Sequence, residues 1–427
     1  MINEHSLKAI EGGLFQKGFC RPLYNSYCFS RIPASIRYLL TGKGKELALP
    51  HDVFGKHREP CDIVLLVLLD GFGWRFFEHY RTQYPFLRWF EEEGVVSKIT
   101  SQFPSTTAAH VTCLHTGLEV GVSGVYEWFY YEPLVDRVIA PLLTSFAGDK
   151  ELSTLEATGI DLATLYPKTT IYQNFKKEGI HSFVFQPINI AHSSFSQAMC
   201  KEAIYMPYHH ISEGLDRVVE LINTLPRGEK HYLYLYFSEI DSAGHRSGLF
   251  SHEYEQTVVQ TMAQLEQRLH EKVQKINRNA SLIVTADHGM IEIDPKKTIY
   301  LNFQFPELLP MLKKNHLGFP IVPAGSCRDF FLHIEEPFLE EASKLLQKGL
   351  RDRAWVVKTS ELLEQGFFGE KTPSSEFLER VGNLVVLSYE HESIWWYEKN
   401  RFDQHFLAMH GGLTTEEMET IFLFAKF

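Results

Sequence analysis

The 427-residue sequence predicts an α/β fold class with a parallel sheet, and three observations lead to this prediction. Short apolar runs recur along the chain, as in strands that are buried on both faces of a parallel sheet. A long segment with helical periodicity separates two of these runs, so strands and helices alternate. With 44% hydrophobic and 22% charged residues, the composition is that of a globular protein and excludes disorder, collagen-like repeats and coiled coils.

The N-terminal part of the chain divides into two segments. Residues 1–50 show no sharp periodicity, and we expect them to form a wrapping segment with short helices. Residues 51–290 should form the α/β core, because their apolar runs have the length and sharp ends of buried strands. Four such runs predict strands at residues 63–69, 182–185, 232–237 and 281–285.

One long helix is predicted between the last two of these strands. Apolar residues recur there at spacings of three and four, which gives a single apolar stripe. We expect this stripe to pack against the sheet. It consists of Val258, Met262, Leu265, Leu269, Val273 and Ile276.

The sequence changes character after residue 290. Residues 291–405 hold most of the late prolines and aromatic residues, and they contain a pattern of strand, helix and strand. We interpret them as an inserted α+β subdomain, after which residues 406–427 return to the core. The expected elements of this subdomain are residues 329–334, 337–350 and 355–358.

Targeting signals and cysteines bear on the protein's compartment. The N-terminus lacks the charged start, apolar stretch and cleavage site of a secretory signal. The longest apolar run, residues 63–69, is far too short to span a bilayer. Six cysteines are scattered without a C-x-x-C pair, which indicates buried thiols in a reducing compartment. We therefore expect a cytoplasmic protein without a membrane span, although export by a specialised route stays open.

The formal net charge of −11 narrows the choice of partners. It argues against binding to a nucleic-acid scaffold, because a surface that follows phosphates usually has a basic excess. It is compatible with a small anionic substrate, because bound metal can invert the local field. No oligomeric state is predicted.

Four apolar segments end abruptly in residues of the kind that bind metals. In open α/β sheets the ligand crevice lies at the carboxyl ends of the strands. We therefore expect these side chains to converge, although they are up to 340 positions apart in the sequence. They are three aspartates and three histidines, namely Asp70, Asp241, His245, Asp287, His288 and His410.

Each of these residues has a simpler interpretation when it is considered alone. An aspartate after a strand is usually a turn or helix-cap residue, and Asp241 and His245 would also suit a helix start without metal. Several such motifs at one sheet edge are harder to explain in this way. Three ionised carboxylates would repel one another and raise their own pKa values, and divalent cations would remove that conflict. A mixed Asp/His set suits zinc, with manganese as an alternative.

A fifth motif, Phe-Pro-Ser-Thr-Thr-Ala-Ala-His at residues 103–110, follows an apolar stretch and precedes a helical pattern. Thr107 therefore falls near a helix N-terminus, where backbone N–H groups favour an anion. A threonine hydroxyl is a poor nucleophile until a metal lowers its pKa. The alternative is N-capping by Ser105, Thr106 or Thr107, and the two roles can coexist.

With these five motifs, the chain resembles the alkaline phosphatase superfamily and, within it, the type I phosphodiesterase/nucleotide pyrophosphatase family. The resemblance runs from about Ile63 to Leu413, with every metal-binding motif in the family's order. It implies an alkaline-phosphatase-like three-layer αβα sandwich with a mostly parallel central sheet and the inserted α+β subdomain. It also implies two zinc ions and a nucleophile three positions after the proline of the F-P-x-x-T motif, which selects Thr107 over Thr106.

The resemblance further implies how the metals are held and what they do. One set of ligands would be Asp70, Thr107, Asp287 and His288, and the other would be Asp241, His245 and His410. Three aspartates and one threonine alkoxide carry four negative charges, which two divalent cations balance. The implied reaction is hydrolysis of phosphodiester or pyrophosphate bonds in a small phosphorylated substrate, a nucleotide, through a covalent phosphothreonine.

The sequence departs from the family at one motif. The nucleotide phosphodiesterases carry H-G-x-x-x-N after T-G-L, and the asparagine helps to hold the phosphoryl oxygens. Here Trp128 stands in the asparagine's place, with Glu127 beside it. A phosphate would repel an acidic side chain, so we expect Glu127 to point away or to engage a cation or a substrate hydroxyl.

Aromatic residues near the motifs are candidates for stacking on a base. Trp74 closely follows Asp70, while Tyr126 and Trp128 follow the expected nucleophile helix. Packing in the core is the alternative for each of them. Arg328, beside a Gly-Ser turn, could reach an anionic group.

Two other functions stay open. A phosphomonoesterase or phosphonate hydrolase on the same scaffold would share the motifs, because the chemistry of the site does not fix the class of ester. A non-catalytic pseudoenzyme that binds nucleotides or a partner protein would be favoured by a lost ligand or nucleophile, and none is lost.

Overall fold

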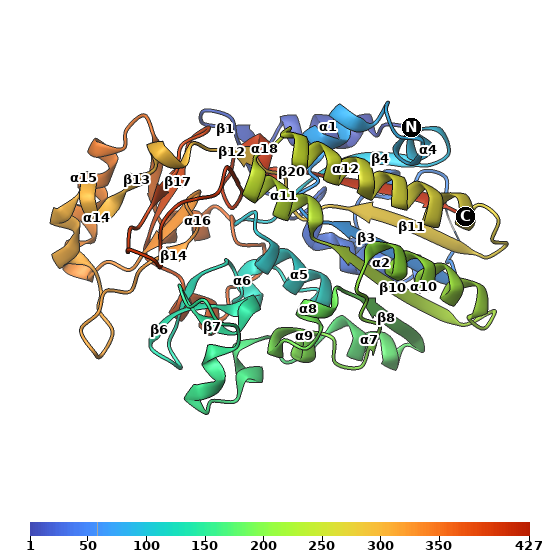
Figure 1. The fold of residues 1–427 in the computed structure, drawn as a ribbon, viewed down its shortest axis with the longest axis horizontal. Coiled ribbons are helices and arrows are strands. Elements are labelled where there is room, and N and C mark those ends of the chain that lie inside the picture. The colour runs from blue at the N-terminus through green and yellow to red at the C-terminus, as the bar shows by residue number, and fades with distance from the viewer. Residues whose placement is uncertain (58) are drawn as a thin grey trace.

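The computed structural model describes residues 1–57 and 59–427, and its core is a seven-stranded sheet (Figure 1). The four strands predicted from apolar runs are all present, with ends within two residues of the prediction. The strands follow the order β4 (Val95–Thr100), β20 (Glu419–Lys426), β11 (Ala280–Thr285), β3 (Ile63–Leu69), β10 (Lys230–Phe237), β8 (Ile180–Phe185) and β9 (Ile204–Tyr205).

The sheet is mostly parallel, as predicted. β3 pairs in parallel with β10 on one side and with β11 on the other, and β8 and β9 extend the parallel set. β20 runs antiparallel to both of its neighbours, β11 and β4. The adjacent strands β11, β3 and β10 therefore end at the same edge of the sheet, which is where a ligand crevice is expected.

Helices cover both faces of the sheet, because its central strands are apolar on both sides. All seven residues of β3 are buried; Val64, Leu66 and Leu68 face one core and the residues between them face the other. The first core is covered by α2 (Ile32–Thr41), α5 (Thr107–Thr116) and α7 (Ile171–Lys177). The second is covered by α3 (Trp74–Tyr80), α4 (Pro85–Glu92), α10 (Ile211–Thr224) and α12 (His252–Gln264).

The predicted long helix is present but is not uniform. α12 ends at Gln264, a π-helical stretch (Leu265–His270) follows, and α13 (Glu271–Val273) completes the helix. Its stripe residues are buried against the sheet, except that Ile276 lies just beyond α13 and is only partly buried.

Residues 291–405, at the left of Figure 1 in orange, contain a four-stranded antiparallel sheet and helix α15 (Leu339–Gly349). Its order is β14 (Ala324–Gly325), β15 (Asp329–Leu332), β17 (Leu384–Ser388) and β16 (Ala354–Lys358). The predicted strand, helix and strand correspond to β15, α15 and β16, whereas the prediction missed β17. Alternate residues of β17 face a separate core and the first core of the large sheet, so the two parts are packed together.

The chain leaves and re-enters the α/β core at neighbouring points. β12 (Ile291–Glu292) pairs antiparallel with β19 (Ala408–Met409), so the two ends of residues 291–405 lie side by side. β19 is followed by the short helix α18 (Thr415–Met418) and then by β20. His288 lies just before β12, and His410 lies just after β19.

The N-terminal segment lies against an outer strand of the sheet. α1 (Glu4–Glu11) packs beside β4, where the N–H of Asn3 donates to the carbonyl of Val96 at 2.8 Å. Further described elements are β1 (Leu14–Phe15), β2 (Phe19–Cys20), α6 (Val120–Ser123), β5 (Tyr130–Glu132), β6 (Arg137–Ala140), β7 (Ser145–Phe146), α8 (Ile188–Ala191), α9 (Ser194–Met199), α11 (Glu239–Ser247), β13 (Ile299–Tyr300), α14 (Leu301–Gln304), α16 (Thr359–Glu364), α17 (Ser375–Arg380) and β18 (Ile394–Trp395). The division of the chain at residues 50, 290 and 405 stays a prediction.

Candidate active site

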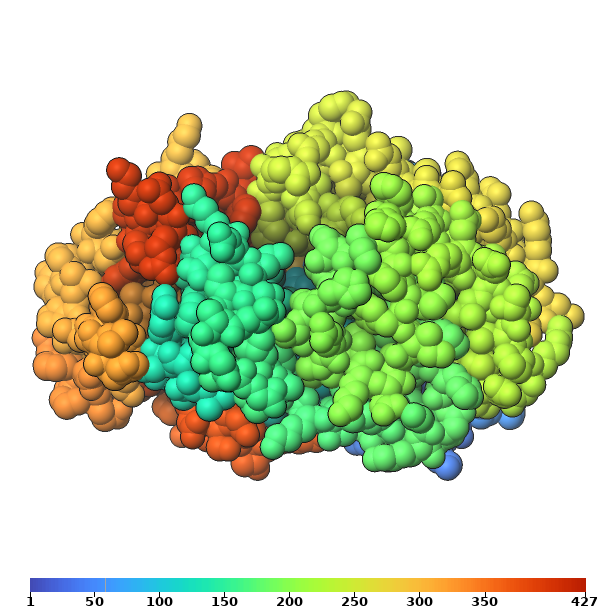
Figure 2. Space-filling model, turned by 60° about the horizontal axis from the view of Figure 1, so that its bottom comes forward, coloured from blue at the N-terminus to red at the C-terminus, as the bar shows by residue number. Residues whose placement is uncertain are grey.

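The seven predicted metal-ligand residues come together at one edge of the large sheet. The strand ends contribute Asp70 after β3, Asp287 and His288 after β11, and Asp241 and His245 on α11 after β10. His410 enters from the loop after β19, and Thr107 is the first residue of α5. Figure 2 shows a hollow near the middle of the surface, between the teal-green segment around residues 130–160 and the yellow-green segment around residues 240–255.

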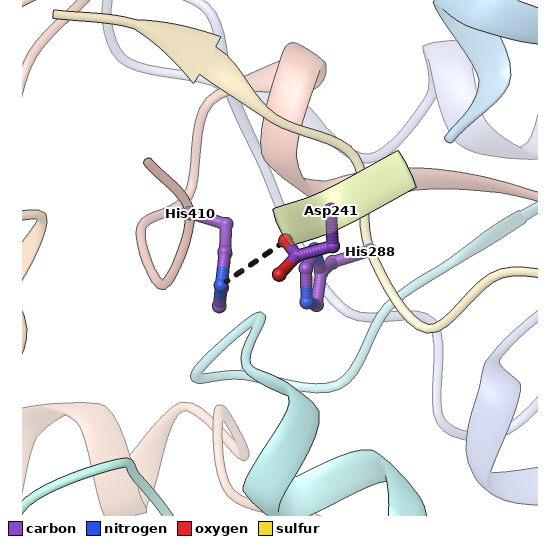
Figure 3. A group of neighbouring side chains, drawn as sticks. All are labelled: Asp241, His288 and His410. Atoms are coloured by element: carbon purple, nitrogen blue, oxygen red, sulfur yellow. Dashed lines mark ion pairs between the residues drawn. The ribbon is translucent and has the colours of Figure 1, made fainter. Parts of the chain in front are cut away.

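Two groups of side chains in this site could each hold a metal ion. Ligand atoms of Asp70, Asp287 and His288 lie within 4.8 Å of one another, and so do those of Asp241, His288 and His410 (Figure 3). His288 therefore lies between the two groups rather than in one alone. His245 adjoins the second group, because its Nε2 is 3.3 Å from Oδ1 of Asp241.

A glycine lets the strand ends approach one another at this site. Gly71 has a φ of +71°, and a Cβ on it would lie only 3.1 Å from the Cβ of Asp241. Its N–H donates to Oδ1 of Asp287 at 3.1 Å. The turn after β3 thus brings three aspartates, Asp70 among them, into one small volume.

The three histidines are oriented as metal ligands usually are. The Nδ1 atom of His288 donates to the carbonyl of Gly289 at 2.9 Å, and that of His245 donates to Ala408 at 2.8 Å. His410 Nδ1 donates to the carbonyl of Ser105 at 2.9 Å. A carbonyl can only accept, so each ring keeps its proton on Nδ1 and presents the Nε2 lone pair to the site.

The electrostatics of the site also fit bound cations. Burial and the neighbouring carboxylates raise the pKa of Asp70 well above its ordinary value, and burial raises the pKa of Asp287 to about 7. Burial lowers the pKa values of His288 and His410 well below the usual range, so both rings are neutral near pH 7. Oδ1 of Asp241 and Oδ2 of Asp287 are buried and lack hydrogen-bond partners. Unpaired carboxylate oxygens beside neutral imidazoles are a donor set that suits zinc or manganese.

Thr107 is placed as a nucleophile of this centre would have to be. Its hydroxyl donates to Oδ1 of Asp70 at 3.3 Å and lies 3.2 Å from Nε2 of His288. Thr106 is the N-cap of α5, but its side chain makes no capping hydrogen bond. Of the two adjacent threonines, Thr107 is therefore the one whose hydroxyl contacts the candidate ligands.

Sequence reasoning missed one residue of the site, Tyr236. Its hydroxyl donates to Oδ2 of Asp70, opposite the contact of Thr107 with Oδ1. The available signal was the alternation of Tyr232, Tyr234 and Tyr236 along β10, which places all three rings on one face of the sheet. Only the last of them reaches the edge where Asp70 lies.

The candidate substrate-binding aromatic residues lie in different environments. Trp74 is 3% exposed and packs against Phe77 in the helix layer. Tyr126 is fully buried between Tyr130 and the subdomain. Trp128 is partly exposed, and among these three it is the only residue that is not buried.

Two charged candidates are fully buried. Glu127 is fully buried; its carboxylate accepts from the N–H of Trp128, and burial raises its pKa to about 8. Arg328 is also fully buried and forms an ion pair with Glu417 at 2.9 Å. A Cβ on Gly411, next to His410, would lie 3.2 Å from Oε1 of Glu127, so this carboxylate lies beside the candidate site. Whether Glu127 points away from a bound phosphate or engages a cation or a substrate hydroxyl stays a prediction. The guanidinium of Arg328 is held inside the protein by Glu417 rather than presented to a substrate.

Two further findings concern the cysteines and the helices of the chain. All six cysteines are free and buried. Among the described residues, the structure contains no helix with the length and apolar character that a membrane crossing requires.

The chain is similar to curated proteins named ectonucleotide pyrophosphatase/phosphodiesterase. It is 26% identical to family member 7 from Rattus norvegicus over 251 residues, which is 57% of this chain and 53% of that protein. Member 7 from Homo sapiens is 25% identical over 57% of this chain and 51% of its own length. The chain thus spans about half the length of the curated relatives it matches. Their names give no support to the cytoplasmic expectation, which stays a prediction.

Solved structures show a similar fold. Murine ectonucleotide pyrophosphatase/phosphodiesterase 5, in an inactive form in complex with AMP, matches with a TM-score of 0.63 and 20% identity, over 84% of this chain and 87% of that one. Phosphonoacetate hydrolase from Sinorhizobium meliloti, in complex with phosphonoformate, matches with a TM-score of 0.59 and 18% identity, over 87% and 92% of the two chains. The fold is therefore the predicted alkaline-phosphatase-like one.

The family itself follows from a match over most of the chain. The sequence profile of the family described as type I phosphodiesterase / nucleotide pyrophosphatase matches residues 64–413. This range contains all seven candidate ligand residues as well as the inserted subdomain. The chain belongs to the type I phosphodiesterase/nucleotide pyrophosphatase family.

Proposed function

We propose that the protein is a two-metal hydrolase that cleaves phosphodiester or pyrophosphate bonds of nucleotides through a covalent phosphothreonine. The observation that carries this proposal is the position of Thr107, whose hydroxyl lies within 3.3 Å of both Asp70 and His288. The AMP complex of the murine relative supports a nucleotide substrate.

The seven residues divide between two metals, zinc or manganese. We assign Asp70, Thr107, Asp287 and His288 to one ion, and Asp241, His245 and His410 to the other. Bound divalent cations supply positive charge, which lowers the pKa of a hydroxyl and stabilises the phosphoryl oxygens and the leaving group. The unpaired oxygens of Asp241 and Asp287 support this assignment.

The residues of the chain then carry out two displacements. The Thr107 hydroxyl gives up its proton, for which the Asp70 carboxylate is the neighbouring acceptor, and its oxygen attacks phosphorus. The bond from phosphorus to the leaving oxygen breaks, and that oxygen departs with the electron pair. Water then attacks the phosphothreonine, the bond from phosphorus to Thr107 breaks, and the hydroxyl is restored. Because Thr107 begins α5, the free N–H groups of that helix face the negative charge.

A paired assay tests the class of ester. Zinc-loaded and chelator-treated protein is given the p-nitrophenyl ester of thymidine 5′-monophosphate, a diester, and p-nitrophenyl phosphate, a monoester. We expect kcat/KM to favour the diester at least about tenfold, which corresponds to about 1.4 kcal/mol, and both activities to depend on metal. A preference for the monoester would show that the departure at Trp128 has changed the reaction class. It would favour the phosphomonoesterase reading.

Trp128 gives a second prediction, on substrate binding. Stacking of a base on an aromatic ring contributes about 1–3 kcal/mol, so Trp128→Ala should raise KM for the nucleotide diester about tenfold. The kcat for p-nitrophenyl phosphate should not change. Trp74→Phe, at a residue packed in the helix layer, is the matched control and should leave both constants near wild type. An unchanged KM in Trp128→Ala would remove the ring from the substrate site.

A further inference from the structure

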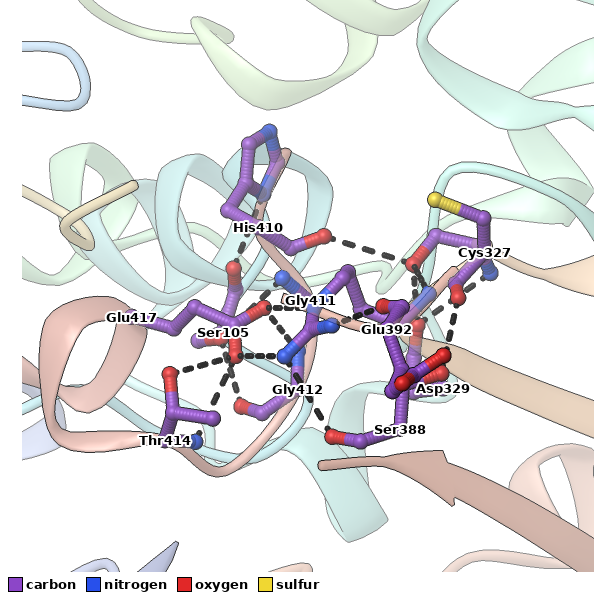
Figure 4. Close-up of polar contacts among 12 residues, drawn as sticks. Ser105, Cys327, Asp329, Ser388, Glu392, His410, Gly411, Gly412, Thr414 and Glu417 are labelled. Carbon is purple, nitrogen blue, oxygen red and sulfur yellow. Dashed lines mark hydrogen bonds and ion pairs between the residues drawn. The ribbon is translucent and has the colours of Figure 1, made fainter. Parts of the chain in front are cut away.

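We propose that Arg328 and Glu417 are positioning residues for the candidate metal ligand His410, so that the inserted subdomain holds part of the metal centre in place. The inference rests on the proposed metallohydrolase function for its readout. It concerns a contact between Arg328 in the inserted subdomain and Glu417 in the α/β core. Figure 4 shows the polar contacts of Glu417 with Gly412 and Thr414 and those of Ser105 with the loop His410–Gly412.

Glu417 is the centre of the network on the side of the α/β core. It lies on α18 and is fully buried. Its Oε1 accepts from the N–H of Gly412 at 3.0 Å, and its Oε2 accepts from the hydroxyl of Thr414 at 2.8 Å. The carboxylate therefore holds Gly412 and Thr414, which follow His410 closely in the chain.

Arg328 supplies the opposite charge from the subdomain, in the turn between β14 and β15. Its Nε donates to Oε1 of Glu417 at 2.9 Å, and its Nη2 donates to Oε2 at 3.0 Å. The guanidinium also donates to the carbonyls of Ser388 and Glu392. Two parallel hydrogen bonds fix the orientation of the carboxylate as well as its position.

The loop that carries His410 is joined to the nucleophile segment through Ser105. The Ser105 hydroxyl donates to the carbonyl of Gly412 at 2.8 Å, and the N–H of Gly411 lies 3.2 Å from the same hydroxyl. Nδ1 of His410 donates to the carbonyl of Ser105, which lies two residues before Thr107. A displacement of Gly412 would therefore move both a candidate ligand and the start of α5.

The two glycines show how closely these groups pack. A Cβ on Gly411 would lie 2.6 Å from the hydroxyl of Ser326 and 2.7 Å from Oδ1 of Asp329, both in the subdomain. A Cβ on Gly412 would lie 2.7 Å from Oε2 of Glu417. The loop is thus held between the subdomain and α18 with no room for a side chain, which makes its position sensitive to both.

A buried ion pair need not be there for stability, because the cost of desolvating two charges can exceed their attraction. A second buried pair in the chain provides the comparison. Arg380 donates to Glu132 at 2.8 Å and to the carbonyls of Gly124 and Leu165 at 3.0 Å each. None of these partners is in the loop His410–Gly412, so this pair should affect folding without affecting the metal centre.

The test measures zinc binding in matched variants. Arg328→Met and Arg328→Lys are compared with Arg380→Met by chelator competition for zinc, by thermal unfolding, and by the visible spectrum of the cobalt-substituted protein. We expect Arg328→Met to weaken zinc binding at one of two sites by about 10–100-fold, which is the usual effect of removing a group that orients a metal ligand. Its cobalt spectrum should change and its kcat should fall, whereas its KM should stay close to the wild-type value.

Arg328→Lys keeps the charge but loses the paired geometry, so its zinc affinity should be intermediate; it also serves if Arg328→Met does not fold. Arg380→Met should lower the unfolding temperature while zinc affinity and the cobalt spectrum stay as in wild type. Wild-type zinc affinity in both Arg328 variants, or an equal loss in Arg380→Met, would overturn the inference. A wild-type protein that binds neither zinc nor manganese would instead overturn the proposed function.

Discussion

Replacement of Thr107 by alanine should lower kcat for a phosphodiester by at least about a thousandfold, because the variant lacks the group that forms the covalent intermediate. The carboxylates and imidazoles of the site remain, so the metal content should stay close to that of wild type. The measurement combines steady-state kinetics with metal analysis of the purified variant. Acid quenching during turnover should trap a labelled phosphoryl group on wild-type protein and none on Thr107→Ala.

The neighbouring threonine is the control for this prediction. Thr106 caps α5 without a side-chain hydrogen bond to the helix, so Thr106→Ala should keep most of the wild-type kcat. Turnover by Thr107→Ala near the wild-type rate would contradict the assignment of the nucleophile. Equal loss in both variants would indicate that the helix start, rather than the hydroxyl of Thr107, is what the substitutions disturb.

Removal of the metals should abolish activity and make the stability of the protein fall as pH rises. Ligands that bind only the folded state stabilise it by about 4 kcal/mol per site at a thousandfold excess over Kd. In the chelated protein, Asp70, Asp241 and Asp287 have pKa values raised in the folded state. The unfolded chain has lost these protons by about pH 6.5, so each proton still bound in the folded state lowers the unfolding free energy by about 1.4 kcal/mol per pH unit above that value.

The change of stability with pH has the opposite sign for the histidines, and this difference sets the pH range in which the prediction can be tested. Folded His288 and His410 have lowered pKa values, so they reduce stability as pH falls below about 6.5, where the unfolded imidazoles take up protons. Above that pH the buried carboxyl groups act, and they include Glu127 and Asp329, whose pKa values burial also raises and which are not proposed ligands. Thermal unfolding of chelated protein between about pH 6.5 and 8.5 should therefore show a falling transition temperature, and zinc should remove most of the slope. A slope that zinc does not change would contradict the assignment of these aspartates as ligands.

Much of the α/β core could be predicted from local patterns. β3 is a run of seven apolar residues that ends at Asp70, and the structure buries all seven. A run of this length, bounded by a turn signal, is typical of a strand that is covered on both faces. The convergence of Asp70, Asp241 and Asp287 could be predicted for the same reason, since they follow parallel strands that end at a common edge. His410 follows β19 outside this sheet, so this argument does not account for its position.

Other features depend on contacts between distant residues and left no local signal. His288 lies between two ligand groups because β3 lies between β11 and β10 and the turn at Gly71 lets Asp241 approach closely, which motif order does not reveal. The pairing of Arg328 with Glu417 spans 89 positions. From the sequence, a single arginine after a turn could equally bind an anionic ligand or pair with a buried carboxylate. Only its burial in the structure distinguishes these two roles.

The pairing of β12 with β19 has a consequence for how this protein could diverge. Because residues 291–405 begin three positions after His288 and end five positions before His410, their length can change without moving either imidazole in space. Such a segment could be replaced by another while the α/β core keeps the candidate ligands in place. A replacement segment would still have to place a guanidinium against Glu417, or Glu417 itself would have to be substituted at the same time.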